Sequence, residues 1–327
     1  MRRDATPWVT VVIPNWNGEK HLVECLDSLR AQTFHDFEVV MVDNGSSDGS
    51  VGLTRAAYPE VRVMETGSNL GFAGAVNLGI GGSAADLVVL LNNDTRVDVA
   101  WLAELVAAAD RHPEASSFAS LMVLYGDSST VNAAGDSFSM GLGTAVNRGL
   151  YEPVERYLEP AWVFGACAGA SMYRSSFFEA VGGFDERYFL MHEDTDLNMR
   201  ALLLGLKCLY VPTAVVAHKL GASIGTLPSR SSLSMSVRNQ TLAAAKTLPL
   251  PLLAAVLPVF VWRDFRATFP LRPSQLGKLP GLLALAPLRC RARWTGLVRG
   301  LHGRSSMQRR VVSIRELVRR FGARPLV

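Results

Sequence analysis

An acidic residue in one short stretch, VVLLNNDTRVD, is the first candidate for chemistry. The aliphatic run Val88–Leu91 is typical of a strand buried on both faces, and two amides, Asp94 and a hydroxyl follow it at once. Asp94 could serve only to cap a strand-to-helix turn, or it could bind a metal ion or a phosphate-bearing ligand. These residues alone leave both interpretations open.

A second acidic cluster, MHEDTDLNMRAL, has three acids within four residues. Asp196 and Arg200 lie four positions apart on an expected helix and should pair. Glu193 and Asp194 fall in the first turn of that helix, where the helix dipole favours a carboxylate and either could simply be a cap. Three mutually repelling acids are more than a cap requires. Asp194 is therefore also a candidate general base for proton transfer.

Three further features are suited to ligand binding. His218 follows a β-rich run, where an imidazole can bind a phosphate or a metal ion, although a lone histidine is more often structural. Asp43 follows another aliphatic strand and can accept hydrogen bonds from a ribose or a base. In NLGFAGAVNLG, Gly71, Gly74 and Gly79 allow close approach of a ligand, but they match neither the dinucleotide fingerprint nor a Walker A loop.

The first 125 residues predict a scaffold for these side chains, because strand and helix signals alternate along them. Such alternation is typical of an α/β fold with a mostly parallel, doubly wound sheet, in which ligands bind beyond the carboxyl ends of the strands. A polar cluster follows each expected strand: PNWNG, DNGSSDGS, GSNLGFAG and NNDT. The expected strands are 8–13, 37–42, 61–64 and 87–91, and the expected helices are 19–30, 48–57, 72–80 and 99–109.

The second half of the chain has a different character. Residues 130–150 predict a hairpin or loop, and 161–207 regain order, ending in a helix at about 193–204. Residues 247–262 carry no charge and three prolines, and at 16 residues they are shorter than a spanning helix. We expect a membrane-interfacial segment there, with a helix packed on the core as the alternative. Residues 311–323 are amphipathic with a basic face, which also favours a membrane surface.

Composition narrows the class of protein. With 49% hydrophobic and 19% charged residues the chain can bury a large core, so disorder is not expected. The four cysteines are isolated, which argues against a disulfide framework or a zinc site, and no apolar run follows the initial arginines, so no secretory signal is expected.

Charge is distributed unevenly along the chain. Residues 1–261 hold 18 Lys/Arg against 27 Asp/Glu, a net charge of −9, whereas residues 262–327 hold 15 against 2, a net charge of +13. This basic tail predicts an anionic partner, either a membrane or a nucleic acid.

The order of these motifs resembles the family 2 glycosyltransferases with the GT-A fold. The resemblance rests on VTVVIPNWNG, VVMVDNGSSDGS, NLGFAGAVNLG, LLNNDT and GGFDERYFLMHEDTDLNMRALLLG, within residues 9–225. The NWNG and NNDT forms, the later HKLGAS and the segment 237–246 are similar to a rhamnosyltransferase-like branch. The resemblance implies a nucleotide-sugar-binding half at 1–125, an acceptor-binding and catalytic half at 126–235, and a helical, membrane-proximal extension at 236–327.

The resemblance also implies roles for individual residues. Asp194 would be the catalytic base. Asp94 matches the last acid of the family's D-x-D motif, which coordinates Mg²⁺ or Mn²⁺ bridging the donor diphosphate, and His218 would contact the diphosphate or complete the metal shell. Since Asn92 replaces the first acid of that motif, we expect poor metal binding without the donor. Other residues would bind substrate: Pro14, Asn15, Asn17, Asp43, Asn69, Gly71, Asn77, Asn93, Glu193 and Arg238.

The function that follows is an inverting glycosyltransferase, with L-rhamnose from dTDP-rhamnose as the first candidate and UDP- or GDP-sugars as alternatives. The acceptor would be lipid-linked or a polysaccharide in cell-envelope glycan synthesis. The enzyme would lie peripherally on the cytoplasmic face of the membrane, bound by its basic tail. A metal-dependent nucleotidyltransferase or phosphohydrolase would not require the HEDTDL cluster. A nucleic-acid-binding protein would leave the four polar clusters without a role, so no nucleic-acid partner is expected.

Overall fold

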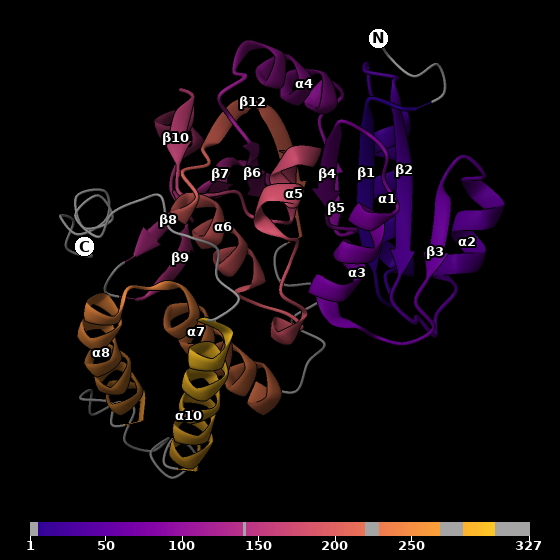
Figure 1. Ribbon diagram of the computed structural model, residues 1–327. Helices are drawn as coiled ribbons and strands as arrows, with labels where there is room; N and C mark the ends of the chain where they lie inside the picture. The colour runs from indigo at the N-terminus through magenta and orange to yellow at the C-terminus, as the bar shows by residue number, and fades with distance from the viewer. Residues whose placement is uncertain (1–5, 140–141, 220–228, 269–283, 305–327) are drawn as a thin grey trace.

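A mixed sheet of ten strands forms the centre of the molecule, which is a computed structural model describing residues 6–139, 142–219, 229–268 and 284–304 (Figure 1). Along the sheet the main order is β10-β12-β6-β11-β4-β1-β2-β3, with β5 beside β12 and β7 beside β6. Strands from both halves of the chain therefore share one sheet.

The N-terminal half forms the expected parallel part of this sheet. β1 lies between β2 and β4 and is parallel to both, and β3 is parallel to β2. The strands are β1 (Val9–Asn15), β2 (Phe37–Asp43), β3 (Arg62–Glu65) and β4 (Leu87–Leu91). The helices between and after them are α1 (Glu19–Arg30), α2 (Ser50–Ala57), α3 (Gly71–Gly81) and α4 (Trp101–Arg111).

The C-terminal half adds antiparallel strands to the parallel part, so the sheet as a whole is mixed. β11 (Ala170–Arg174) is antiparallel to β4 on one side and to β6 (Ser117–Leu124) on the other, and β12 (Cys208–His218) is parallel to β6. The shorter strands β5 (Thr95–Val97), β7 (Asp127–Ala134) and β10 (Ala161–Val163) pair antiparallel at this side. Within 130–150, β8 (Asp136–Ser139) and β9 (Thr144–Asn147) form the expected hairpin.

Helices cover both faces of the sheet and bury separate cores. On one face α1 and α4 pack through residues at helical spacing, including Leu22, Leu26 and Leu29, against the odd-numbered residues of β1. On the other face α3, α5 (Ser175–Val181) and α6 (Glu193–Leu203) pack against Val12 and Val40. Because β1, β2 and β4 are buried on both faces, their polar residues gather at the strand ends, where the site lies.

Three C-terminal helices form an extension beside α6: α7 (Ser229–Thr247), α8 (Leu250–Thr268) and α10 (Ala286–Gly303) (Figure 1). Leu248, Leu253 and Phe260 share a core with residues of α6. α10 approaches α7 closely, since a Cβ added at Gly296 would lie 2.2 Å from the Arg238 carbonyl oxygen. The extension is thus packed against α6.

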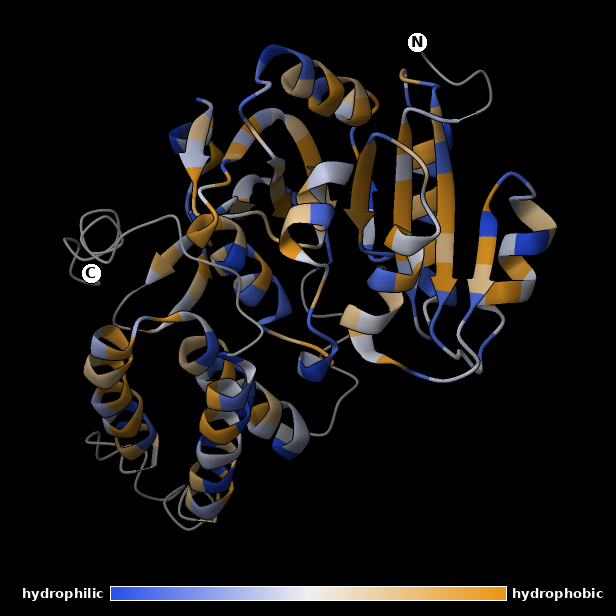
Figure 2. Cartoon of the chain, in the orientation of Figure 1, coloured by the Kyte–Doolittle hydropathy of each residue, from blue (hydrophilic) through white to orange (hydrophobic). Residues whose placement is uncertain are grey.

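The segment 247–262 covers the end of α7 and most of α8, because Thr247 ends α7 and Leu250–Thr268 form α8, and its place at a membrane interface stays a prediction. One face of α8 is packed on the core, as in the alternative interpretation, while Val261 and Trp262 are exposed. Figure 2 shows that much of α8 is hydrophobic. Among the described helices, none combines the length and the hydropathy needed to cross a membrane. The stretch 311–323 lies outside the described residues, and the division of the chain at 125 and 235 stays a prediction.

Candidate active site

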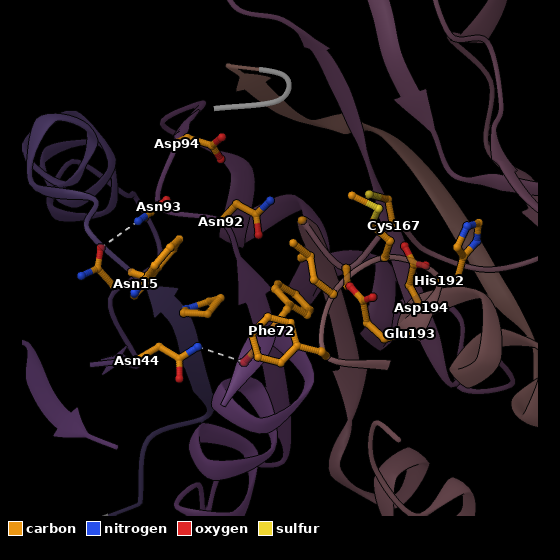
Figure 3. Close-up of a pocket in the computed structure, with 18 of the residues that line it drawn as sticks. Asn15, Asn44, Phe72, Asn92, Asn93, Asp94, Cys167, His192, Glu193 and Asp194 are labelled. Atoms are coloured by element: carbon orange, nitrogen blue, oxygen red, sulfur yellow. Dashed lines mark hydrogen bonds between the residues drawn. The ribbon is translucent and has the colours of Figure 1, made fainter. Parts of the chain in front are cut away.

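A cavity of about 300 Å³ lies beyond the carboxyl ends of β1 and β4, facing the start of α6 (Figure 3). Asn15, Asn93 and Asp94 lie on one side of it, and Glu193 and Asp194 on the other. Nine of the residues expected from the sequence line this cavity: Pro14, Asn15, Asn69, Gly71, Asn93, Asp94, Glu193, Asp194 and His218. Segments far apart in the sequence are thus brought to one place.

Four residues that were expected to bind substrate do not line the cavity: Asn17, Asp43, Asn77 and Arg238. The Asn77 side chain instead donates to the Phe184 carbonyl oxygen (2.9 Å) and accepts from the Phe184 backbone N–H (2.9 Å). These two bonds connect α3 to the loop before α6. Arg238 donates to the Tyr188 carbonyl oxygen (3.2 Å). Asn17 binds the Ser47 backbone N–H through its side-chain oxygen (2.8 Å).

Asp43 acts through Asn15. The buried Asp43 carboxylate accepts from Asn15 Nδ2 (3.1 Å), and Asn15 Oδ1 in turn accepts from Asn93 Nδ2 (2.7 Å). A chain of hydrogen bonds therefore joins the ends of β2, β1 and β4, and it fixes the two asparagines that line the cavity. The register supports this, since Asn15 and Asp43 are direct partners in the parallel ladder.

Asn44 is a cavity residue that the sequence interpretation missed. Its Nδ2 donates to Asn69 Oδ1 (3.1 Å) and to the Gly71 carbonyl oxygen (3.0 Å), and its Oδ1 accepts from the Leu70 backbone N–H (2.8 Å). Asn44 thus holds the turn before α3 against the end of β2. Its position directly after Asp43 in DNGSSDGS was the available signal.

Asp94 and His218 form a pair that suits a cation. His218 Nε2 lies 3.3 Å from Asp94 Oδ1, yet this buried oxygen accepts no hydrogen bond from the described residues. The other ring nitrogen, Nδ1, lies 2.8 Å from Asn132 Oδ1 and donates to it, which leaves a lone pair on Nε2 in the neutral imidazole. One carboxylate oxygen and one imidazole nitrogen are both ligands that divalent ions accept.

The described residues contain no group of three or more His, Cys, Asp and Glu side chains that could hold a metal ion. Asn92, which lines the cavity near Asp94, offers an amide where a second carboxylate would add charge. Two protein ligands hold a divalent cation weakly, so additional oxygens would have to come from a ligand such as a diphosphate. The pair Asp94–His218 therefore fits a cation that binds together with its ligand.

The opposite wall carries buried carboxyl groups. Asp194 Oδ1 accepts a hydrogen bond from the Thr195 backbone N–H (2.7 Å), which favours the ionised form, but burial raises the pKa of Asp194 overall. Burial, together with the charge of Asp194, raises the pKa of Glu193 to about 8. Asp136, a further buried acid, has its pKa raised by burial and by Asp194. Because these neighbouring carboxylates repel each other, they are not all ionised at the same time. Asp194 is the one whose ionised form is stabilised by the hydrogen bond from Thr195.

A strained loop presents Asp194. Phe189, Met191 and His192 have positive φ angles of 65°, 70° and 66°, which are uncommon for residues other than glycine. The Asn239 side chain on α7 donates to the carbonyl oxygens of Tyr188 (2.8 Å), Leu190 (2.9 Å) and Met191 (2.9 Å). One buried amide group thereby holds the loop in this conformation.

The same loop contacts the opposite side of the cavity. The Phe189 carbonyl oxygen accepts from the Phe72 backbone N–H (2.6 Å) at the start of α3. A Cβ at Gly71 would lie 2.4 Å from that oxygen, so only glycine permits this approach. The loop therefore connects the glycine-rich turn with the helix that carries Asp194.

His192, also missed by the sequence interpretation, is half-buried beside Asp194 and lines the cavity. Burial, with a contribution from Arg293, lowers its pKa to about 4, so the imidazole is neutral near pH 7. Its Nδ1 lies 2.9 Å from Thr144 Oγ1, and its Nε2 lies 3.4 Å from Ser236 Oγ. It joins β9, α6 and α7 at the wall of the cavity.

A buried ionic network fixes α6 to α7. The predicted pair is confirmed, since Arg200 Nε lies 2.7 Å from Asp196 Oδ2. Lys246 of α7 joins it, with its Nζ 2.8 Å from Asp196 Oδ1 and 2.7 Å from Asp185 Oδ2. Asp196 is thus a structural acid, whereas Asp194, two residues earlier, faces the cavity.

Comparison with known proteins identifies the class. The family model described as glycosyl transferase family 2 matches residues 10–182. The chain is 33% identical over 251 residues to the N-acetylglucosaminyl-diphospho-decaprenol L-rhamnosyltransferase of Mycobacterium tuberculosis (strain ATCC 25618 / H37Rv), covering 68% of this chain and 80% of that protein. It is 25% identical over 240 residues to the amylovoran biosynthesis glycosyltransferase AmsB of Erwinia amylovora, covering 70% and 75%.

Solved structures show the same fold. S. aureus TarS 1–349 in complex with UDP is similar with a TM-score of 0.54 and 17% identity, covering 91% of this chain and 90% of that one. The mannosyltransferase PcManGT from Pyrobaculum calidifontis, in complex with GDP-Man and Mn²⁺, is similar with a TM-score of 0.53 and 19% identity, covering 93% and 87%. The fold is therefore GT-A, and the chain is a glycosyltransferase. It belongs to glycosyltransferase family 2, in the rhamnosyltransferase branch.

Proposed function

We propose that the protein is an inverting glycosyltransferase that transfers a sugar from a nucleotide-diphospho donor to a lipid-linked acceptor in cell-envelope glycan synthesis. L-rhamnose from dTDP-rhamnose is the first candidate donor, because the similar mycobacterial protein is named an L-rhamnosyltransferase acting on a diphospho-decaprenol. The observation that carries the proposal is one cavity with Asp94 on one side, whose buried Oδ1 accepts no hydrogen bond from the described residues, and Asp194 on the other.

On the donor side, Asp94 and His218 would hold Mg²⁺ or Mn²⁺, whose chemistry is to neutralise charge on the departing nucleotide diphosphate. Asn15, Asn44 and Asn93 offer fixed amides to the nucleotide, and the turn at Gly71 lets the backbone approach it. The donor would thus lie against the ends of β1, β2 and β4, where parallel α/β sheets bind ligands.

On the acceptor side, Asp194 would take the proton of the attacking hydroxyl. The hydroxyl oxygen forms a bond to the anomeric carbon while the bond from that carbon to the diphosphate oxygen breaks, and the proton moves to Asp194. One displacement inverts the anomeric centre, so a single base is sufficient. The neutral His192 beside it would accept or donate a hydrogen bond to the acceptor without adding charge.

The proposed location is the cytoplasmic face of the membrane, with the extension at the surface. Exposed Trp262 and Phe265 on α8, and the basic composition after residue 261, support this location.

Thermal unfolding with a panel of nucleotides tests the donor assignment. The protein would be heated with dTDP, UDP and GDP, each with and without Mn²⁺. We expect one nucleotide to raise the melting temperature with Mn²⁺ and to do so far less without it, because binding at 100 times Kd adds about 2.7 kcal/mol to stability. Failure of every nucleotide diphosphate and its sugar ester to stabilise the protein would contradict the proposal. The nucleotide that stabilises the protein most identifies whether the donor carries dTDP, UDP or GDP.

A further inference from the structure

A second cavity, of about 530 Å³, lies among the C-terminal helices, away from the residues proposed for catalysis. Residues of α7, α8 and α10 line it. α7 takes part in both sites, because its Asn239 holds the catalytic loop and its Thr241 lines the second cavity. The volume lies in the range of about 300–1,000 Å³ that small-molecule sites have.

The walls of this cavity are apolar. Leu257, Phe260, Val261 and Phe265 come from α8, and Leu297 comes from α10. A sugar or a nucleotide would leave its polar groups unpaired against these walls, which costs free energy. A hydrocarbon chain matches them, because burying apolar surface is favourable on both partners.

Two arginines add charge to these walls, and they differ in their partners. Arg293 Nε lies 2.7 Å from Asp264 Oδ2, so its charge is balanced. Among the described residues Arg289 has no carboxylate partner. Its buried Nε donates to no acceptor there, and its Nη1 donates to the Asp264 carbonyl oxygen at 3.3 Å. An unbalanced guanidinium beside apolar walls suits a ligand that is anionic at one end and apolar along the rest.

Exposed aromatic side chains surround the cavity. Trp294 is 67% exposed and Phe265 is 49% exposed, and both line it. Trp262, adjacent on α8, stacks on Phe265 with ring centroids 5.8 Å apart. Tryptophan in such positions is typical of a surface that meets the polar boundary of a membrane. The ligand therefore has access from the lipid phase.

We propose that this cavity binds the isoprenoid chain of a lipid diphosphate, with Arg289 paired to the diphosphate. The inference rests on the proposed function, since the lipid would be the carrier of the acceptor sugar. Arg293 Nη1 donates to Gln240 Oε1 (2.8 Å) and to Thr241 Oγ1 (3.0 Å). These residues directly follow Asn239, which holds the loop before Asp194, so the charged end of the cavity lies near the acceptor side of the active site. The lipid would thereby be held by its chain while its sugar reaches Asp194.

Cys290 provides a direct probe. It lines this cavity and is exposed, whereas Cys25 and Cys208 are buried, and burial raises the pKa of the Cys167 thiol so that it reacts slowly. The full chain would be alkylated with N-ethylmaleimide, and modification of Cys290 followed by peptide mass spectrometry. We expect farnesyl diphosphate to slow this modification at least about fivefold at concentrations where inorganic diphosphate and farnesol have little effect.

Two variants and a control locate the ligand. Ala286→Trp fills the cavity and should abolish protection by farnesyl diphosphate, whereas Leu301→Trp, on the same helix outside the cavity, should preserve it. Arg289→Gln should make farnesol and farnesyl diphosphate nearly equal in effect. Binding of nucleotide in the first cavity, measured in parallel, confirms that each variant is folded.

Several outcomes overturn the assignment. The first is that farnesyl diphosphate does not protect Cys290, and the second is that inorganic diphosphate protects it equally well. The third is that vesicles of anionic phospholipid alone protect Cys290 as well as farnesyl diphosphate does, which would indicate a general membrane surface. If the protein transfers sugar but Cys290 is never protected, the cavity is wrongly assigned and the proposed function stands. If Cys290 is protected but no acceptor is glycosylated, the lipid site stands and the proposed function fails.

Discussion

At the scale of single residues, the arrangement around Asp94 is the most informative feature. Its Oδ1 atom is buried beside His218 Nε2 and accepts no hydrogen bond from the described residues, and a buried polar atom left without one costs free energy unless a ligand supplies it. Asn92 withholds the second carboxylate that the family motif contains. Metal and donor should therefore bind together, with each raising the affinity for the other.

Asp94→Asn should remove the Mn²⁺-dependent part of stabilisation by the nucleotide, because it replaces the charged ligand with a neutral one. Asn92→Asp should do the opposite and let the protein bind Mn²⁺ without nucleotide, about tenfold more tightly than the unmodified chain. Calorimetric titration with MnCl₂, with and without the nucleotide, measures both. Tight Mn²⁺ binding by the unmodified protein alone would show that Asn92 does not have this effect.

The buried Glu193 should make stability depend on pH. Burial and the charge of Asp194 raise its pKa from 4.5 to about 8, so the folded state retains a proton that the unfolded chain releases. This contribution to the free energy of unfolding is complete below about pH 4.5 and is lost as the pH rises through about 8. Glu193→Gln should therefore flatten the fall in stability between pH 5 and pH 8.

Urea unfolding at several pH values measures this effect. The exposed Glu155→Gln serves as the control, since it makes the same change in side chain outside the cavity. An unaltered slope in Glu193→Gln would mean that Glu193 is ionised in the folded protein.

At the scale of elements, the loop between Tyr188 and Glu193 depends on α7. Asn239 makes three hydrogen bonds to the backbone of this loop, and Lys246 adds an ionic link from α7 to α6. The extension therefore holds the loop that leads to Asp194, the proposed catalytic base. Asn239 is best described as a positioning residue, because it contacts the loop and acts through Asp194.

Asn239→Ala should lower kcat by about 10- to 100-fold while changing the donor Kd much less, since the donor contacts lie on β1, β2 and β4. Stability should fall by about 1–3 kcal/mol, because buried carbonyl groups lose their donor. Gln240→Ala is the matched control, because Gln240 lies on the same helix as Asn239 and its side chain donates one hydrogen bond, to the Leu142 carbonyl oxygen. Equal losses of kcat in the two variants would indicate a general effect of destabilising α7.

Some elements could be predicted from the sequence and others could not. The aliphatic runs ending in polar residues located β1, β2 and β4 and the cavity beside them, since local pattern determines both. Insertion of β11 between β4 and β6 could not be predicted, because strand pairing across some 80 residues leaves no local signal. Contacts of Asn239 and Lys246 with residues about 50 positions away were hidden for the same reason.

Residue roles show the same division. Asp94, Asp194 and His218 were recognisable because each ends or begins a regular element at the site. Asp43 and Asn77 have equally suggestive positions, yet their side chains are engaged with Asn15 and Phe184. Burial behind a neighbouring side chain is a tertiary property that a motif does not reveal.

At the scale of the whole molecule, an acidic catalytic body carries a basic extension with exposed aromatic residues on α8 and α10. Deleting everything after Lys246 would be a poor test of membrane binding, because it would remove Leu248, Leu253 and Phe260 from the shared core and expose Ala244 and Ala245. It would also remove Arg304, whose Nη1 donates to the carbonyl oxygens of Ala245 and Leu248. Substitutions on the exposed surface are therefore the better test.

Trp262→Ala should weaken binding to anionic vesicles several-fold without changing the melting temperature, because this side chain is 56% exposed. Trp162→Ala on β10 is the matched control, with an exposure of 51%. Vesicle sedimentation at two salt concentrations measures binding, which should also fall at higher salt. Equal loss in both tryptophan variants would contradict a membrane face on α8.

The central claim is that Asp194 accepts a proton in a sugar transfer whose donor binds on the opposite side of the cavity. The most direct measurement is transfer of the sugar from the stabilising nucleotide sugar to a prenyl-diphosphate-linked acceptor by mass spectrometry, in the unmodified protein and in Asp194→Asn. We predict transfer by the unmodified protein, loss of about 10²–10⁴-fold in kcat in the variant, and unchanged donor binding. Undiminished transfer by Asp194→Asn would contradict the account.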